Sequence, residues 1–510
     1  MDHISATPSA AGRPCYPAPP ISYLPDEIFI EIFHFFTLSP DGIYKDQPLA
    51  NATLLSSICR RWRHLAIQTS SLWSTIEIRK RCARFQGIAG DGVFSEAEKL
   101  LGLEQLYLQR SRDCGLKVIF RHLRDPPMES FEAVADVVLS AFSQWEMLRI
   151  DGWNCEEHQM HRVLSGFLDC CYRNPSQRPR LRSLSLLRSD QDAAVLEKML
   201  LAVLDAAPIR SLELGSINLI LPANIAHSLT HLSLESCSGD SHITPMDLDT
   251  VLRRCAQLQS LRLKLVGTLD SSQPASTPEN IILPHLEEMR LVQAVPNPIQ
   301  RFIYQNVVAP SLLGFAILVA DMDFMSEDAE MFQMSEYDAM ASFLSSTPSI
   351  RSFAYAHLPE DYLTNALQAL PQLVVLTFGF SELERFSMGA AEYVRPPVDI
   401  CPQLSEFRID ACREKAIEFS DLAALKYFIE ARAALPDVVP LRALTVKCGM
   451  EDWQQAHGEE LLELKEWLSS RVELVWKHIE RVAARAYGCW VQRNLGWQCL
   501  KDLKQLQWGR

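Results

Sequence analysis

A chain of 510 residues is longer than one hydrophobic core can serve, so it must form several domains or an elongated repeat array. Its 49 lysines and arginines against 63 aspartates and glutamates give a net charge of −14, which argues against nucleic acid as a general partner. No segment approaches the roughly 18 uninterrupted apolar residues of a membrane span, so we also expect no membrane partner.

Residues 1–20 are rich in proline and small residues, and this composition predicts a disordered arm. The arm lacks the basic and apolar regions of a secretory signal, so we expect an intracellular protein of the cytoplasm or nucleus. The 14 cysteines are scattered without a C-x-x-C pair, which favours buried thiols in a reducing compartment.

One group of potential metal ligands occurs in the middle of the chain. Its spacing matches no zinc-binding template, so we expect a plain helix there, with neither a metal ion nor a cofactor. The group comprises Cys155, His158, His161, Cys170 and Cys171.

The segment at 21–36 predicts the first helix. Pro25 suits the first helical position, and Asp26 and Glu27 complement the positive end of the helix dipole. Two apolar rows at helical spacing make this helix apolar around much of its girth. The rows are Ile28, Ile32 and Phe35, and Phe29, Phe33 and Phe36.

A second helical stretch is expected after a loop at 39–48, and Trp73 closes the module. A module of fewer than about 60 residues cannot bury this much apolar surface by itself. The surplus either packs on the following domain or forms a partner-binding face, and physical chemistry alone leaves both open. The apolar residues of the second stretch are Leu54, Leu55, Ile58, Cys59, Trp62 and Leu65.

The module at 21–78 closely resembles the F-box. The likeness is carried by Leu24-Pro25-Asp26-Glu27-Ile28, Ile32-Phe33, the run from Ile58 to Ala66, and Leu72-Trp73. In that family the module is a three-helix unit that docks on a Skp-type adaptor, which links it to a cullin-based ubiquitin ligase. The adaptor contacts that the resemblance implies are Leu24, Pro25, Ile28, Ile32, Ile58, Cys59, Trp62 and Leu65.

The loop at 39–48 departs from the family pattern, because it is longer than the few residues usual between the first two helices. Lengthening a surface loop costs little free energy, so we expect the fold to be kept. The proline-rich arm, the longer loop and the ending LWSTIEI together look like F-box proteins of mushroom-forming fungi.

The stretch at 100–450 repeats the pattern L-x-x-L-x-L at intervals of roughly 20 to 38 residues, which predicts an irregular leucine-rich-repeat array. Trp145-Leu148-Ile150 is a poorer match. The units are Leu103-Leu106-Leu108, Leu181-Leu184-Leu186, Ile209-Leu212-Leu214, Leu229-Leu232-Leu234, Leu258-Leu261-Leu263, Leu286-Met289-Leu291, Leu312-Phe315-Ile317, Ile350-Phe353-Tyr355, Leu373-Leu376-Phe378, Leu404-Phe407-Ile409 and Leu441-Leu444-Val446.

Each L-x-L predicts a strand with its apolar residues on one side, and amphipathic helices between the units can cover that side. The expected fold class is therefore α/β: a small helical module, then a solenoid with a curved parallel sheet and outer helices. Leucine-rich strands alternating with helices also describe other α/β proteins, but the number of units in order favours the solenoid.

The other face of the strands is the predicted surface for binding a target protein, because charged rows there suit a partner of mixed charge. Polar residues on a solvated strand are the plainer interpretation of each position taken alone. The candidate residues are His231, Glu235, Arg262, Lys264, Arg290, Arg408 and Asp410.

Residues 451–510 predict a helical segment in which the repeat has stopped. We expect it to cap the open end of the solenoid or to form a partner-binding tail.

The chain carries no phosphate loop, nucleophile elbow, dinucleotide-binding turn or zinc-protease motif, so we expect no catalytic residue and no enzyme. The resemblance implies a substrate receptor of a cullin-based ubiquitin ligase. The alternative is an interaction scaffold that does not act in degradation.

Overall fold

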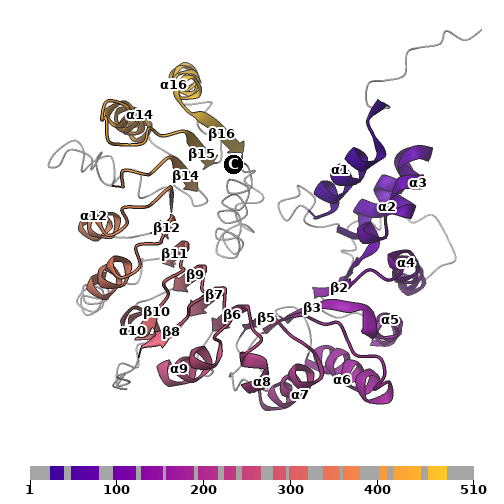
Figure 1. Cartoon of the computed structure of the whole chain (residues 1–510). Coiled ribbons are helices and arrows are strands. Elements are labelled where there is room, and N and C mark those ends of the chain that lie inside the picture. Colours follow the sequence, from indigo (N-terminus) through magenta and orange to yellow (C-terminus); the bar gives the residue numbers. More distant parts are fainter. Residues whose placement is uncertain are drawn as a thin grey trace, which may run out of the picture. The chain divides into compact units, whose positions relative to one another are not determined.

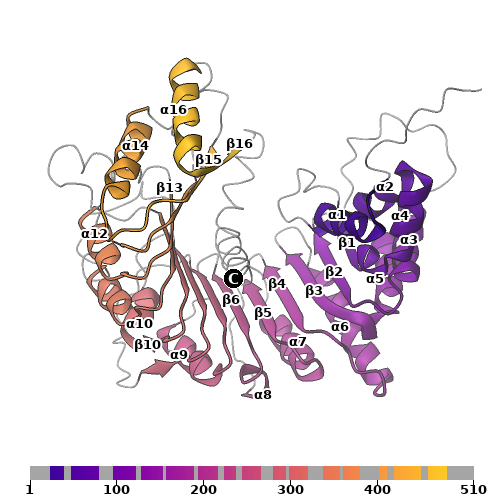
Figure 2. The same ribbon diagram turned by 45° about the horizontal axis from the view of Figure 1, so that its top comes forward.

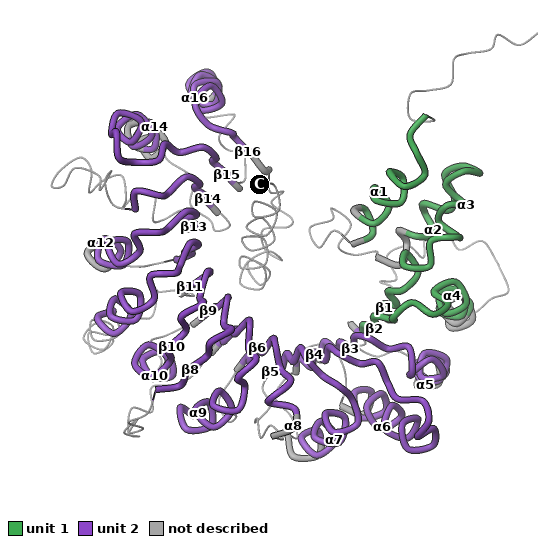
Figure 3. The backbone as a smooth tube through the Cα atoms, viewed as in Figure 1, with its two compact units in different colours: residues 1–78, 82–119 green, residues 79–81, 120–510 purple. Residues whose placement is uncertain are grey.

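The computed structural model of the chain divides into two compact units, residues 1–78 with 82–119 (unit 1) and residues 79–81 with 120–510 (unit 2), shown in Figure 3. The predicted arm at 1–20, the loop at 39–47 and residues 479–510 lie outside the described residues. The structure describes residues 23–38, 48–79, 96–121, 128–152, 157–188, 193–215, 223–236, 244–265, 280–293, 298–319, 337–356, 360–379, 401–410, 419–448 and 458–478.

Unit 1 begins with three α-helices, and the expected second helical stretch is two helices. Cys59 divides them: its backbone is extended, and its Sγ accepts a hydrogen bond from the backbone N–H of Trp62, which caps the third helix. The elements are α1 (Asp26–Leu38), α2 (Pro48–Ile58), α3 (Arg60–Gln68), η2 (Ser70–Trp73), β1 (Thr75–Arg79), α4 (Glu96–Ser111) and β2 (Leu116–Arg121).

The helix α4 overturns one predicted repeat unit, because Leu103, Leu106 and Leu108 lie in it and not in a strand. Leu103 and Leu106 are three residues apart, a spacing that also fits a helix face, so this single match to the repeat pattern was ambiguous. Tyr107 of α4 packs edge-on against Trp73, with ring centroids 5.0 Å apart. Trp73 therefore lies between the helices of the module at 21–78 and α4 within unit 1.

Unit 2 contains a long parallel sheet with helices on one side, which is consistent with a repeat solenoid (Figures 1 and 2). Its strands follow one another in chain order. They are β3 (Trp145–Gly152), β4 (Ser183–Arg188), β5 (Ser211–Gly215), β6 (His231–Ser236), β7 (Ser260–Leu265), β9 (Glu288–Gln293), β11 (Gly314–Val319), β12 (Ser352–Ala356), β13 (Val375–Gly379), β14 (Glu406–Asp410), β15 (Ala443–Cys448) and β16 (Glu473–His478).

The helices of unit 2 lie between consecutive strands in the chain. They are α5 (Met128–Leu139), η4 (Phe142–Gln144), α6 (Glu157–Arg173), α7 (Ala193–Ala206), α8 (Ala223–Ala226), α9 (Pro245–Arg254), α10 (Pro298–Asn306), α12 (Glu360–Gln368), α14 (Phe419–Ala433) and α16 (Gly458–Arg471). Two short strands, β8 (Ile281–Ile282) and β10 (Val307–Val308), form a separate parallel pair.

The two apolar residues of each L-x-L align across the sheet in continuous rows. Leu212 pairs with Leu232, and Leu214 with Leu234, and the same register holds from β3 to β16. A slip by one residue would turn both rows toward the opposite face, so burial of this side fixes the register.

Backbone hydrogen bonds link each unit to the one before it. The amides of Arg210 and Ser211 both donate to the carbonyl of Arg182, and those of Thr230 and His231 both donate to the carbonyl of Arg210. The same pair of hydrogen bonds to one carbonyl recurs along the array. The accepting carbonyls after Arg210 belong to Thr230, Gln259, Glu287, Leu313, Arg351, Val374 and Ser405.

The repeat pattern predicted both ends of the array inaccurately. The poorer match at Trp145 is a full strand, β3, in which Trp145, Leu148 and Ile150 are buried. At the other end the repeat does not stop at Val446, because β16 follows helix α16 and pairs with β15. The predicted C-terminal helical segment thus contributes one further helix and strand.

A buried arginine holds the connections around β14. Arg432 of α14 is 0% exposed, and its Nη2 donates to the carbonyls of Cys401, Leu404 and Val439 at 3.2, 3.0 and 3.1 Å. Cys401 has a φ of 55°, which is strained for a residue with a Cβ. Burial raises the pKa of the Cys401 thiol to about 12.

We expect Arg432→Met to lower the free energy of unfolding by about 3 kcal/mol, because several buried carbonyls lose a charged donor. Urea denaturation of the full chain measures this change. Arg351→Met, at an exposed position just before β12, is the matched control and should change stability by less than about 0.5 kcal/mol. Equal effects of the two substitutions would contradict this role of Arg432.

Candidate functional site

Four large aliphatic side chains are exposed on the first two helices of unit 1. Ile28 and Ile32 lie one turn apart on α1, and Leu54 and Ile58 lie one turn apart on α2. All four are 43–53% exposed, and the two helices pack against each other. Exposed aliphatic pairs on a small helical module are typical of an interaction surface. We call these four residues the aliphatic set.

Arg61 of α3 fixes the turn that precedes α1. Its Nη2 donates to the carbonyl of Leu24 at 2.6 Å, and its Nε and Nη2 donate to Oδ1 of Asp26 at 3.0 and 2.6 Å. The guanidinium also lies over the ring of Phe29, 4.6 Å from its centroid. The Leu24-Pro25 turn is thus held by a residue from a different helix.

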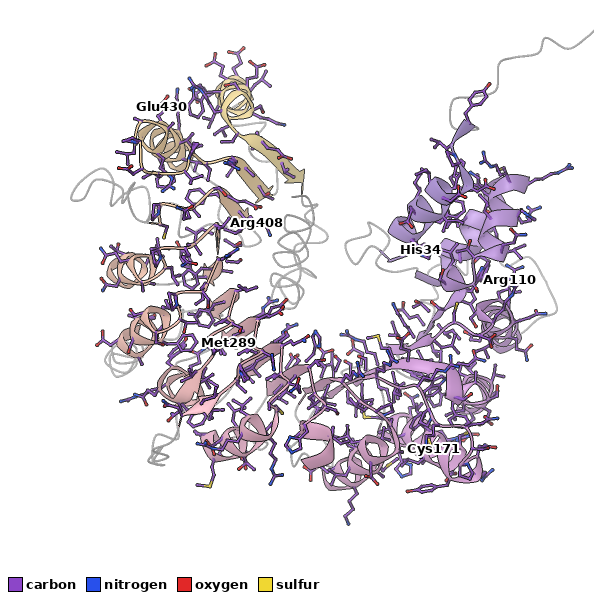
Figure 4. All side chains as sticks on the ribbon, viewed as in Figure 1. His34, Arg110, Cys171, Met289, Arg408 and Glu430 are labelled. Atoms are coloured by element: carbon purple, nitrogen blue, oxygen red, sulfur yellow. The ribbon has the colours of Figure 1, made fainter. Side chains whose placement is uncertain are left out.

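Aromatic rings hold the opposite side of α1. Trp62 is half-buried and meets Phe29 and Phe33 edge-on, with centroids 5.7 and 5.0 Å apart. His34 of α1, labelled in Figure 4, is 3.2 Å from the hydroxyl of Ser71 through its Nε2. These contacts fix the rotation of α1 and leave Ile28 and Ile32 outward.

Trp73 anchors the end of the module. Its Nε1 donates to the carbonyl of Ala66 at 2.6 Å, and the guanidinium of Arg110 lies 4.3 Å from its ring centroid (Figure 4). Burial raises the pKa of Tyr107, its ring neighbour, to about 12, while a hydrogen bond to Thr53 works against that rise. Part of the predicted apolar surplus therefore packs on α4.

The structure places the predicted adaptor contacts in three environments. Ile28, Ile32, Ile58, Cys59 and Pro25 are exposed, and Leu24 and Trp62 are half-buried. Leu65 is 4% exposed and belongs to the core of unit 1, so its prediction as a surface contact is corrected. A leucine on the third helix packs inward once three helices surround it.

Two other exposed residues are not among the predicted adaptor contacts. Leu54, predicted only as an apolar residue of the second helical stretch, stands four residues before Ile58, and this helical spacing was the signal that could have added it. Tyr23 is exposed just before the Leu24-Pro25 turn, and no pattern in the sequence marks it.

The comparisons with known proteins bear on this module. Residues 21–79 match the F-box-like family. No curated protein matches the chain. A crystal structure of a Bacteroides fragilis protein shares 10% identity over 69% of this chain and 72% of that one, with a TM-score of 0.28, a value too low to support an argument.

The predicted target-binding residues lie on the face of the unit 2 sheet opposite the helices, which we call the inner face. Arg262 and Arg290 are paired neighbours on β7 and β9, and His231 and Arg408 lie on β6 and β14. Four strand steps separate β9 from β14, which corresponds to about 19 Å. The candidates therefore form two groups.

Several of these charged residues interact within the sheet, so the plainer interpretation of solvated side chains does not describe them. Lys264 forms an ion pair with Glu235, and Arg408 Nε donates to Glu406 Oε1 at 2.6 Å. Glu235, Arg290 and Arg408 are buried, at 5, 6 and 9% exposed. The side chain of Asp410 lies outside the described part of the chain.

The group of potential metal ligands from Cys155 to Cys171 lies only partly within the described residues. Residues 157–173 form the helix α6, as expected, whereas Cys155 lies outside the described residues. Among the residues that the structure describes, no three His, Cys, Asp or Glu side chains are grouped to hold a metal ion. No described helix is both long enough and apolar enough to cross a membrane.

We expect Leu65→Ala to destabilise the protein by about 2–4 kcal/mol, because it removes buried core volume. Ile58→Ala, an exposed position on the preceding helix, should change stability by less than about 0.5 kcal/mol. Thermal unfolding of the two full-length variants measures the difference. A large loss in Ile58→Ala would mean that the aliphatic set is not a free surface.

Proposed function

We propose that this chain is a substrate receptor of a cullin-based ubiquitin ligase. Unit 1 docks on a Skp-type adaptor, and unit 2 is a leucine-rich-repeat array that binds the protein to be ubiquitinated. The match of residues 21–79 to the F-box-like family supports the first part, because F-box domains generally bind Skp-type adaptors. The observation that carries the proposal is the aliphatic set on that same module.

The aliphatic set suits a partner with an apolar groove. Truncation of such central aliphatic side chains removes much of an interface's binding free energy, while polar neighbours contribute less. Arg60, Arg63 and His64 are exposed on α3 beside Ile58 and Cys59 and would form a polar rim. Leu24 and Pro25 extend the surface at the start of α1, in a turn held by the contacts of Arg61, whereas Trp62 packs against Phe29 and Phe33.

The mechanism needs no catalytic side chain, as F-box proteins typically act as adaptors without chemistry of their own. A receptor that holds a target lysine near a ubiquitin-charged carrier raises the effective concentration of the reacting groups. The cullin reaches this chain through the adaptor, inside the cell. The likeness to proteins of mushroom-forming fungi stays a prediction.

The second candidate is an interaction scaffold that uses the same adaptor without promoting degradation. Both candidates share the adaptor contact, and they differ in whether a cullin joins the complex. Reconstitution of the full chain with adaptor and cullin, followed by size-exclusion chromatography, separates them. A ternary complex favours the receptor, and a complex that excludes the cullin favours the scaffold.

We expect the full chain to bind a purified Skp-type adaptor, and we expect Ile28→Asp and Ile58→Asp each to weaken binding about thirtyfold or more, because a charge enters an apolar interface. Isothermal titration calorimetry measures the dissociation constants. Ile282→Asp, at an exposed position in unit 2, is the control and should bind as the wild type does. Failure of the folded wild-type chain to bind would overturn the proposed function.

A further inference from the structure

Burial of apolar surface alone does not decide which side of α1 faces outward. The helix carries two apolar rows one residue apart: Phe29 and Phe33 are 1 and 0% exposed, whereas Ile28 and Ile32 are 45 and 43% exposed. Both rows consist of large apolar side chains, and the hydrophobic effect has no preferred direction. A rotation of the helix by about 100°, the angle of one residue, would bring the isoleucines inward. Directional contacts are therefore needed to select the row that packs inside.

The same ambiguity holds for α2. Leu54 is 50% exposed, and the next residue, Leu55, is 4% exposed. Since the two side chains are identical, hydrophobicity cannot choose between them. The chain itself also places α1 and α2 only loosely, because α1 ends at Leu38, α2 begins at Pro48, and a connection of this length constrains its ends weakly. The orientation of both helices therefore depends on α3, which packs against each of them.

Arg61 of α3 supplies directional contacts to α1. Its Nε and Nη2 donate to Oδ1 of Asp26 at 3.0 and 2.6 Å, and Nη2 also donates to the carbonyl of Leu24 at 2.6 Å. Its guanidinium lies 4.6 Å from the ring centroid of Phe29, and Trp62 meets the same ring edge-on at 5.7 Å. Two consecutive residues of α3 thus hold the phenylalanine row inward, which leaves the isoleucine row outward.

Arg63 of α3 makes the corresponding contact to α2. Its Nε donates to the carbonyl of Ser56 at 2.9 Å. Ser56 lies in the last turn of α2, where backbone carbonyls have no partner within the helix. Cys59 alone separates α2 from α3, so this hydrogen bond closes a tight corner. A second hydrogen bond joins Thr53 of α2 to Tyr107 of α4, so Arg63 shares the orientation of α2 with that helix.

We propose that Arg61 and Arg63 are positioning residues for the adaptor contact, Arg61 for the exposed isoleucines of α1 and Arg63 for the exposed aliphatic residues of α2. This inference rests on the proposed function, in which the aliphatic set binds the adaptor. The helix α3 is then the element to which both halves of the set are attached. Each arginine acts through the half that it orients and not through its own charge.

The donor atoms separate this role from a direct ionic contact with the adaptor. Both Arg61 and Arg63 donate through Nε, and a lysine side chain has a methylene group at that position. Substitution by lysine therefore keeps the positive charge but removes the Nε donor and the planar guanidinium. A residue that served only as a charge would tolerate this substitution, whereas a positioning residue would not.

The first experiment measures binding of a purified Skp-type adaptor to the full chain by isothermal titration calorimetry. We expect Arg61→Lys and Arg61→Gln each to weaken binding about threefold to tenfold, and Arg63→Lys and Arg63→Gln likewise, because one half of the aliphatic set loses its orientation. Arg351→Lys, at an exposed position in unit 2, is the control and should bind as the wild type does. Loss of affinity in the glutamine variants alone would indicate direct ionic contacts and would overturn the proposal.

The second experiment combines these substitutions with truncation of the aliphatic set. In a double-mutant cycle, the loss of affinity caused by Ile28→Ala should be about threefold smaller in Arg61→Lys than in the wild type, because the isoleucine row is already displaced there. The loss caused by Ile58→Ala should be equal in these two backgrounds. Arg63→Lys should give the reverse pattern. Additive losses in all four combinations would contradict the assignment of one arginine to each half.

Hydrogen exchange of the full chain without the adaptor keeps failure of this inference distinguishable from failure of the proposed function. We expect Arg61→Lys to speed amide exchange in α1 about threefold or more and to leave α2 unchanged, and Arg63→Lys to do the opposite, because a released helix opens locally more often. This pattern in chains that bind no adaptor would support the positioning and overturn the proposed function. Unchanged exchange in both helices would overturn the inference, whatever the adaptor result.

Discussion

The array depends on one repeated backbone interaction, in which two successive amides at the start of each unit from β5 to β15 donate to a single carbonyl of the unit before. Buried amides and carbonyls must be paired, so this arrangement satisfies the groups that enter and leave each strand. It involves no side chain. Its only demand on the sequence is that two apolar residues follow at alternate positions and face the helices.

The sequence predicted the parallel sheet because that demand leaves a visible pattern. It misplaced the ends for a related reason. Leu103 and Leu106 satisfy the spacing of a helix as well as that of the repeat pattern, and their helix was not recognised. The strand β16 was missed because its alternation follows directly on helix α16, with one residue, Val472, between them. Periods of 2 and 3.6 residues are hard to separate over six positions.

The candidate site was predictable in part for a physical reason. Helical spacing shows which residues share a face, and it identified Ile28, Ile32 and Ile58 correctly as residues of apolar faces. It does not show which face remains outward, since that depends on how three helices pack. Leu65 is buried and Leu54 is exposed, and only the packed module distinguishes them. Part of the apolar surplus packs on α4 through Trp73, while the aliphatic set stays exposed.

The hydrogen-bonded carbonyls are 20 residues apart between Arg210 and Thr230 and 38 apart between Leu313 and Arg351. Each unit is therefore hydrogen-bonded to the unit before it at one short segment. The number of residues between two such segments is not constrained by the adjoining units. Insertions, deletions and substitutions on the inner face can accumulate in one unit while the adjoining units keep their register. A repeat array of this construction can change its inner-face surface during evolution by small local edits, without refolding the units around them.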